Sequence, residues 1–213
     1  APRYARTGER FRADGGHIPR VQLTRQMRIV LVHGAGGSPF SWSQVVPLVV
    51  ASASAAPPRE VIVLDHPSRS HIATVADVNA ILDESSEPAL LVGHSYGGAV
   101  ITDAGRHQHV RGLVYVAAFA PDAGETIDDI VERHGAAELF QDTPLGSVDD
   151  LVMPGAGDED WARHSWDVPD DIRIAAAEHT RPISTTIFHS RAGVPAWRTR
   201  RTWYLVAARD KHI

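Results

Sequence analysis

Residues 89–101 read ALLVGHSYGGAVI, and no other stretch of the chain says as much about its fold. The start of the stretch, residues 89–93, is mostly apolar, which is typical of a strand buried on both faces of a sheet. GHSYG at residues 93–97 then leads into residues that favour a helix. A G-x-S-x-G pattern at such a corner is typical of a nucleophile elbow, whose strained turn exposes the serine hydroxyl at the carboxyl edge of the sheet. The pattern predicts a nucleophile at Ser95; a chance turn of small residues is the alternative.

The rest of the chain repeats the order of strand and helix. Apolar runs predict further strands at residues 29–33, 60–65, 110–119 and 202–207. Helical patterns are expected at residues 41–53, 74–83 and 96–107, with Ser41 as the cap of the first. Strands that alternate with helices over short connections imply right-handed crossovers and a parallel sheet. The sequence therefore predicts an α/β fold.

Two parts of the chain depart from this alternation. Residues 121–197 are rich in Asp, Glu, Gly and Pro and have only weak helical segments, near 127–134 and 170–178, so we predict an inserted cap. Residues 1–26 mix Arg, Gly and Pro with little periodicity, and we expect a disordered or upstream extension before a domain of residues 27–213. A short organelle-targeting segment is the alternative for this Arg-rich start.

Composition restricts the class of protein. The chain has 213 residues, of which 43% are apolar and 22% charged, as in a globular protein with its own core. It has no cysteine, which excludes disulfides, zinc–cysteine sites and thiol nucleophiles. No apolar run is long enough to span a membrane, and no secretory signal is visible. We expect a cytoplasmic protein without membrane contact, and the preference for Arg over Lys is typical of a GC-rich bacterial genome.

The charge distribution argues against nucleic acid as a partner. The net charge is −5, although residues 1–28 hold seven Arg against two acidic residues. The remainder is therefore more acidic than the whole chain and would repel phosphate.

A second motif, HGAGG at residues 33–37, follows the first predicted strand. Acyl transfer needs hydrogen-bond donors that point at the oxyanion as it forms, and a glycine-rich turn presents backbone N–H groups without obstruction. We predict that the N–H groups of Ala35 and Tyr96 form this oxyanion hole. A phosphate loop and a dinucleotide fingerprint are the alternatives, but the first lacks its Lys and the second its third Gly.

Together, three segments resemble the α/β-hydrolase superfamily: HGAGGSPFSW at residues 33–42, GHSYGGA at 93–99 and VYVAAFAP at 114–121. The resemblance runs from about residue 28 to the end, and the branch is that of small esterases, which includes plant methylesterases and hydroxynitrile lyases. It implies a mostly parallel sheet with helices on both faces and a cap over the site. It also implies a Ser–Asp–His triad in that chain order, with no cofactor and no metal.

The resemblance places the catalytic acid at Asp210, after WYLVAARD at residues 203–210. An ordinary exposed aspartate is the alternative reading, and Asp122, after the strand ending at Phe119, is the second candidate. The family's histidine lies well beyond its acid, whereas this sequence ends three residues after Asp210. We therefore expect the final strand, the final helix and the catalytic histidine to be missing and this form to be impaired.

None of the twelve histidines stands at the family's position. His212 is too close to Asp210 in sequence, and His94 leaves the elbow in a different direction from its neighbour. His33 is expected to support the oxyanion turn. The others singled out are expected at the surface: His107, His109, His179 and His189.

Three functions are compatible with these motifs. Hydrolysis of a small carboxylic ester is favoured, with Trp161, Trp166, Phe119 and His33 as candidate substrate contacts. Hydroxynitrile-lyase chemistry is an alternative, although Gly34 stands where those lyases carry a hydroxyl residue. A non-catalytic ligand-binding protein is the third possibility. The sequence does not determine the natural substrate or the oligomeric state.

Overall fold

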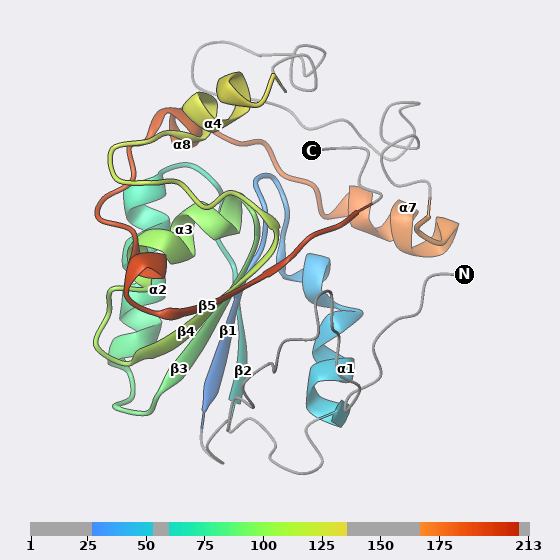
Figure 1. Cartoon of the computed structure of the whole chain (residues 1–213). Helices are drawn as coiled ribbons and strands as arrows, with labels where there is room; N and C mark the ends of the chain where they lie inside the picture. Colours follow the sequence, from blue (N-terminus) through green and yellow to red (C-terminus); the bar gives the residue numbers. More distant parts are fainter. Residues whose placement is uncertain (1–26, 53–59, 136–166, 209–213) are drawn as a thin grey trace, which may run out of the picture.

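The computed structural model describes residues 27–52, 60–135 and 167–208 and contains one parallel sheet. Its strands have the order β2-β1-β3-β4-β5, as Figure 1 shows. Their bounds are β1 Arg28–Val32, β2 Glu60–Leu64, β3 Ala89–Ser95, β4 Val110–Ala118 and β5 Arg201–Leu205. Every neighbouring pair is parallel, which confirms the predicted sheet.

The strand order reverses at the centre of the sheet. The chain runs from β1 outward to β2, then returns to the other side of β1 for β3. In open α/β sheets, the carboxyl ends of the strands at such a switch point leave room for a ligand. The loops that follow β1 and β3 therefore meet where chemistry is expected.

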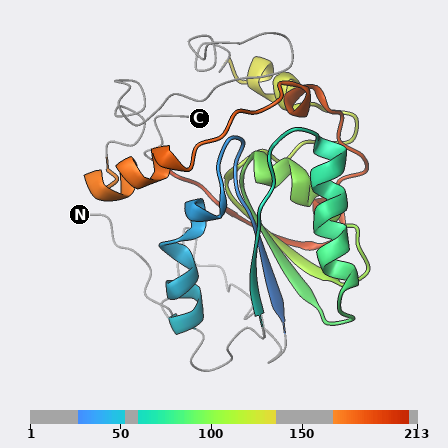
Figure 2. The same ribbon diagram turned by 180° about the vertical axis from the view of Figure 1, so that it is seen from behind.

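Helices cover both faces of the sheet. α2 (His71–Asp83) and α3 (Tyr96–Ala104) lie on one face and α1 (Val45–Ser52) on the other, as the two views of Figures 1 and 2 agree. All residues of α3 are buried, which makes it the central helix of the core. Its Ile101 packs with strand residues such as Leu91 and Leu113, and burying one such side chain stabilises the fold by roughly 1.5–3 kcal/mol.

The first helix was predicted as one continuous segment over residues 41–53, and both its start and its continuity were predicted wrongly. A 3₁₀ turn, η1 (Pro39–Trp42), comes first, and α1 begins only at Val45. The cap is Ser38, whose hydroxyl accepts from the Phe40 N–H at 3.2 Å, and not Ser41. The cause is Pro39, which lacks an N–H and has a fixed φ and therefore suits the first position of a helical turn. The residue before it, Ser38, is then the cap.

The second helix begins three residues earlier than predicted. Its N-cap is Ser70, whose hydroxyl accepts from the Ala73 N–H. α3 ends at Ala104, because Gly105 follows and closes the helix. Among the described residues, the other α-helices lie on the side of the carboxyl edge: α4 (Ile127–Arg133), α7 (Asp170–Glu178) and α8 (Thr186–His189). A second 3₁₀ turn, η2 (Ala196–Arg198), precedes β5.

The predicted cap is only partly described. α4 and α7 confirm the two weak helical segments, and α4 begins with a capping box formed by Thr126 and Asp129. Residues 1–26 and 136–166 lie outside the described residues, so the limits of the extension and of the cap stay predictions. Within the described ranges, no helix has the length and apolar character that crossing a bilayer requires.

Candidate active site

The strand-to-helix corner is present and strained. Ser95 is the last residue of β3 and immediately precedes α3, and its φ of 51° and ψ of −122° lie outside the helical and extended regions. Such a conformation costs a residue other than glycine of order 1–3 kcal/mol and is found mainly at functional sites. The Ser95 carbonyl accepts from the Phe119 N–H at 3.1 Å, which ties the corner to the end of β4. Ser95 itself is half-buried.

Both outer glycines of the motif are required by close packing. A Cβ on Gly93 would lie 2.4 Å from the Gly97 carbonyl oxygen, and one on Gly97 would lie 2.4 Å from the Val32 carbonyl oxygen. Neither neighbour is a flexible side chain, so neither can move away cheaply. The G-x-S-x-G pattern is therefore a steric requirement of this corner.

The glycine-rich turn after β1 lies directly against the elbow. A Cβ on Gly34 would lie 3.0 Å from Ser95 Cβ and 3.4 Å from its hydroxyl oxygen. The turn closes with a Gly37 N–H to Gly34 carbonyl bond of 3.2 Å, and the Gly36 N–H donates to Ser68 Oγ at 3.3 Å. Across residues 27–52, 60–135 and 167–208, the Ala35 N–H has no hydrogen-bond acceptor.

The second amide belongs to the first turn of α3. Tyr96 begins this helix, and the Ser95 side chain does not cap it. N–H groups in a first helical turn lack intrahelical partners and carry the positive end of the helix dipole. The two predicted oxyanion donors thus flank Ser95, one from the turn and one from the helix.

Two buried histidines support the turn of residues 33–37 through hydrogen bonds to its backbone. The rings of His33 and His66 stack with centroids 3.8 Å apart and are fully buried. His33 Nδ1 donates to the Gly34 carbonyl at 2.8 Å, and His66 Nε2 donates to the His33 carbonyl at 3.2 Å. Burial is the main cause that lowers the pKa of His33 to about 4 and that of His66 to about 3. Both rings are therefore neutral supports at physiological pH.

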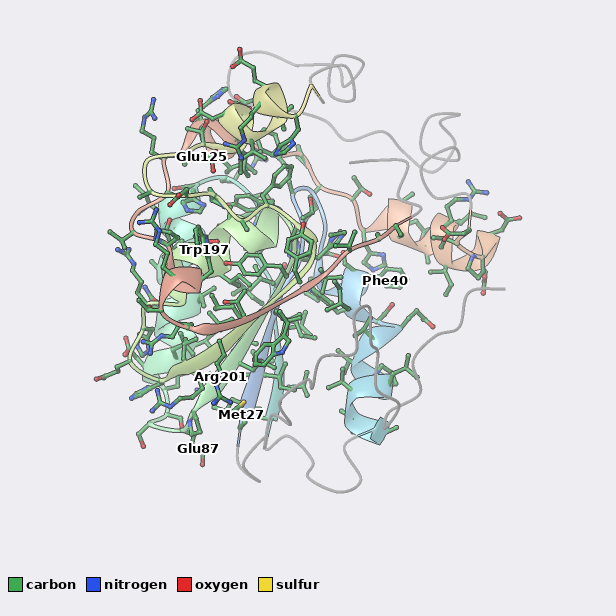
Figure 3. The ribbon with its side chains drawn as sticks, in the orientation of Figure 1. Met27, Phe40, Glu87, Glu125, Trp197 and Arg201 are labelled. Atoms are coloured by element: carbon green, nitrogen blue, oxygen red, sulfur yellow. The ribbon has the colours of Figure 1, made fainter. Side chains whose placement is uncertain are left out.

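The remaining histidines have their own partners. His179 and His189 are exposed, as predicted, and His179 stacks on Phe40 of η1 with centroids 4.6 Å apart. Figure 3 labels Phe40. His107 and His109 are half-buried and not at the surface, because they bond to Asp83 and to the Leu82 carbonyl at the end of α2. In the described part of the chain, no group of side chains could hold a metal ion.

Of the two candidate catalytic acids, the structure describes Asp122 but not Asp210. Asp122 is half-buried, accepts from the Ala123 N–H and pairs with Arg198, and these contacts hold the pKa of its carboxyl below the usual range. Asp210, Trp161, Trp166 and His212 lie outside the described residues. The strand before Asp210 is present as β5, parallel to β4, so it ends at the same edge as Ser95. Phe119 is buried in the core beside that edge.

Seven described histidines form hydrogen bonds to groups other than the Ser95 hydroxyl: His33, His66, His71, His107, His109, His179 and His189.

Arg181 contacts the glycine-rich turn as well. No local sequence pattern predicts this contact, because the two segments are 144 residues apart.

Comparison with known proteins gives a consistent result. The profile of a family described as "Alpha/beta hydrolase family" matches residues 29–213. A solved pyrethroid hydrolase from Sphingobium faniae is 24% identical, with a TM-score of 0.64 over 78% of this chain and 72% of that chain. An extracellular alpha/beta-hydrolase from a Paenibacillus species is 16% identical, with a TM-score of 0.67 over 84% of this chain and 76% of that one. A methylesterase from Arabidopsis is 18% identical, with a TM-score of 0.61 over 87% and 79%. None of the curated proteins matches the chain.

Proposed function

Because the chain belongs to the alpha/beta hydrolase family, we propose that it is a serine hydrolase that cleaves small carboxylic esters through an acyl-enzyme on Ser95. The observation that carries the proposal is the geometry at one corner. A strained serine ends β3, the turn of residues 33–37 lies within contact distance of it, and the uncapped start of α3 follows. An α/β fold alone would not fix the reaction.

The proposed reaction has two stages. The Ser95 oxygen attacks the ester carbonyl carbon while a general base takes its proton, and the Ala35 and Tyr96 N–H groups stabilise the negative oxygen. The base then returns the proton to the leaving alcohol as the carbon–oxygen bond breaks. In the second stage, water attacks the acyl carbon while the base takes a proton from it. The bond to the Ser95 oxygen then breaks, the base returns the proton to Ser95, and the carboxylic acid is released. In the family resemblance this base is a histidine that Asp210 would orient. Since no histidine of this sequence stands at that position, we expect hydrolysis by this form to be weak.

The substrate class follows from the relatives and from Gly34. Solved neighbours are named as a pyrethroid hydrolase, a polyneuridine aldehyde esterase and a methylesterase, and we extend ester hydrolysis to this chain as part of the proposal. The Cβ of a larger residue at position 34 would lie 3.0 Å from Ser95 Cβ and 3.3 Å from His94 Nδ1. The hydroxyl residue of the lyase branch would therefore need rearrangement here, which favours the hydrolase. Contacts from Trp161 and Trp166 to substrate remain part of the proposal.

The domain limits and the location complete the proposal. We assign the hydrolase domain to residues 27–213, with the cap at about 121–197 and residues 1–26 outside the domain. A cytoplasmic, bacterial origin stays a prediction from composition.

The decisive experiment compares a serine variant with a matched control. The protein should hydrolyse p-nitrophenyl acetate above the buffer rate. A fluorophosphonate probe should label Ser95, and peptide mass spectrometry would identify the labelled residue. Ser95→Ala should remove both signals. Ser190→Ala should retain them, because that hydroxyl only donates to the Thr186 carbonyl. Hydrolysis and labelling that survive Ser95→Ala would refute the proposal.

A further inference from the structure

Arg181 joins the cap side of the molecule to the turn beside the nucleophile. It lies just after α7, where the chain returns toward the sheet. Its backbone N–H donates to the Gly36 carbonyl at 2.8 Å. Its guanidinium donates twice to the Gly37 carbonyl, from Nε at 3.0 Å and from Nη2 at 2.7 Å. Two consecutive carbonyls of the turn are thus held by one residue.

The same guanidinium also reaches the loop after β2. Nη2 lies 3.1 Å from the His66 carbonyl and 2.7 Å from an Asp65 carboxylate oxygen. A charged donor makes hydrogen bonds about twice as strong as neutral ones, and a guanidinium presents its donors in a fixed plane. Arg181 therefore connects the loops that follow β1 and β2.

His33 lies beside the guanidinium in its neutral form. His33 Nδ1 carries a hydrogen because it bonds to the Gly34 carbonyl, so Nε2 has a free lone pair. Arg181 Nη2 lies 3.4 Å from that Nε2, but its two hydrogens have nearer oxygen acceptors on Gly37, Asp65 and His66. The positive charge next to this ring is one of the causes that lower the pKa of His33, after burial.

A clamp of this kind adds to the bonds of Gly34 and Gly36 already described, and it matters because the turn is rich in glycine. HGAGG contains three glycines, which lose more backbone freedom on ordering than any other residue. Yet an oxyanion hole works only when its donors already point at the position where charge develops. The Ala35 N–H lies on the Gly34–Ala35 peptide plane, whose carbonyl accepts from His33 Nδ1 and from the Gly37 N–H. The carbonyls of Gly36 and Gly37 lie on the later planes of the turn, so Arg181 fixes the far end of the same turn.

We propose that Arg181 is a positioning residue, whose hydrogen bonds to the Gly36 and Gly37 carbonyls fix the far end of the turn and so help to keep the Ala35 N–H directed at the oxyanion. The inference rests on the proposed function of Ser95. Arg181 acts through the turn and does not contact the substrate. Its loss should lower the rate of the chemical step and leave the binding of a small ester nearly unchanged.

The test measures chemistry and turn structure separately. In Arg181→Ala, the first-order rate of Ser95 labelling by the fluorophosphonate should fall about 10²-fold, since misplacement of about 1 Å near the chemistry can cost that much. The KM for p-nitrophenyl acetate should change less than about threefold, as expected for an interaction expressed in the transition state. Arg181→Lys should recover part of the rate, and added guanidinium ion should partly rescue the alanine variant.

The matched control is Arg191→Ala. Arg191 is also an arginine near the cap that donates to a carbonyl, that of Gly124 at 2.7 Å, but it does not touch the turn. Its removal should leave the labelling rate within about twofold of the parent protein. If Arg181→Ala does not fold, Arg181→Lys carries the comparison.

Amide hydrogen exchange provides the second readout. Exchange of the Ala35 and Gly36 amides should accelerate at least about tenfold in Arg181→Ala, while amides of β3 exchange as before. Labelling of the parent at Ser95 with an unchanged rate in Arg181→Ala would overturn the positioning role. If the parent is not labelled at Ser95, the proposed function fails, and exchange alone decides whether Arg181 holds the turn: unchanged exchange overturns it and faster exchange supports it.

Discussion

The centre of the sheet and its β5 side hold their backbones in different ways. At the centre, β1 and β3 end in turns whose glycines touch backbone atoms of neighbouring segments, and the histidines beneath them are fully buried. At the outer side, β5 exposes most of its side chains, with Tyr204 at 49% and Leu205 at 54%. Close packing therefore fixes the backbone around Ser95, whereas a few side-chain contacts fix β5, the strand that leads toward the candidate acid.

Adding one methyl group at the centre should have the largest effect. Gly97→Ala places a Cβ 2.4 Å from the Val32 carbonyl oxygen, and neither strand nor helix can yield without disturbing the elbow. We expect the free energy of unfolding to fall by about 3 kcal/mol or more. Urea unfolding followed by circular dichroism measures it.

The control for this substitution is Gly135→Ala. Gly135 differs from Gly97 in having a positive φ, of 65°, but nothing lies within 4 Å of its Cβ position. Only the backbone cost remains, which is about 1–2 kcal/mol. Equal losses at both positions would show that the tight packing at the elbow has no special weight.

Acid should weaken the centre next most strongly. An unfolded histidine titrates near 6.5, whereas burial lowers the pKa of His33 to about 4 and that of His66 to about 3. Below pH 6.5 the unfolded chain therefore binds more protons than the folded one, so stability falls as the pH drops from about 6.5 toward 4. The difference for His33 alone corresponds to roughly 3 kcal/mol. Urea midpoints at pH 7.5, 6 and 5 would show this loss.

A variant can assign the acid sensitivity to the stacked pair. His66→Phe keeps a ring on His33 but removes one titrating group, so stability should depend less on pH between 6.5 and 4. His134→Asn changes an exposed histidine and should keep the dependence of the parent. If the parent protein has the same free energy of unfolding at pH 7.5 and at pH 5, then His33 and His66 do not form a neutral buried pair.

These central features are also the ones that the sequence predicts best. An apolar run, two glycines and a serine define the elbow within a few neighbouring residues, so local sterics reveal it. HGAGG is similarly local. The Ser38 cap was missed because Pro39 starts the helical turn three residues before the predicted position, an effect that helical periodicity alone does not show.

Long-range contacts set the limit of prediction. Arg181 and Gly37 meet across 144 residues, and the sequence does not say which arginine will face the turn. His107 and His109 look like the polar end of a helix, yet α2 packs beside α3 and partly buries them. Burial of polar side chains depends on how helices are placed, which short motifs do not encode.

On the outer side, the main expected effect comes from Tyr204. Its hydroxyl accepts from the Ala118 N–H at 2.9 Å and donates to the Ala118 carbonyl at 2.5 Å. Tyr204→Phe should cost about 1 kcal/mol, because β5 keeps its ladder with β4 and the ring keeps its stacking on Tyr115. Thr202→Ala, at an exposed position of β5, is the control. A loss near that of Gly97→Ala would mean that the outer strand is as constrained as the centre.

The smallest effect is expected at Asp122, and it also separates the two candidate acids. The Asp122 carboxylate is about half exposed, accepts from the Ala123 N–H and pairs with Arg198, so it already has partners other than a catalytic base. Exposed pairs of this kind contribute little to stability. Asp122→Asn should therefore leave the thermal midpoint almost unchanged and the rate of Ser95 labelling within about twofold. A drop of 10²-fold or more, with the fold intact, would move the acid from the strand that leads to Asp210 to the end of β4. It would also mean that the loosely packed β5 side is not needed to orient the base.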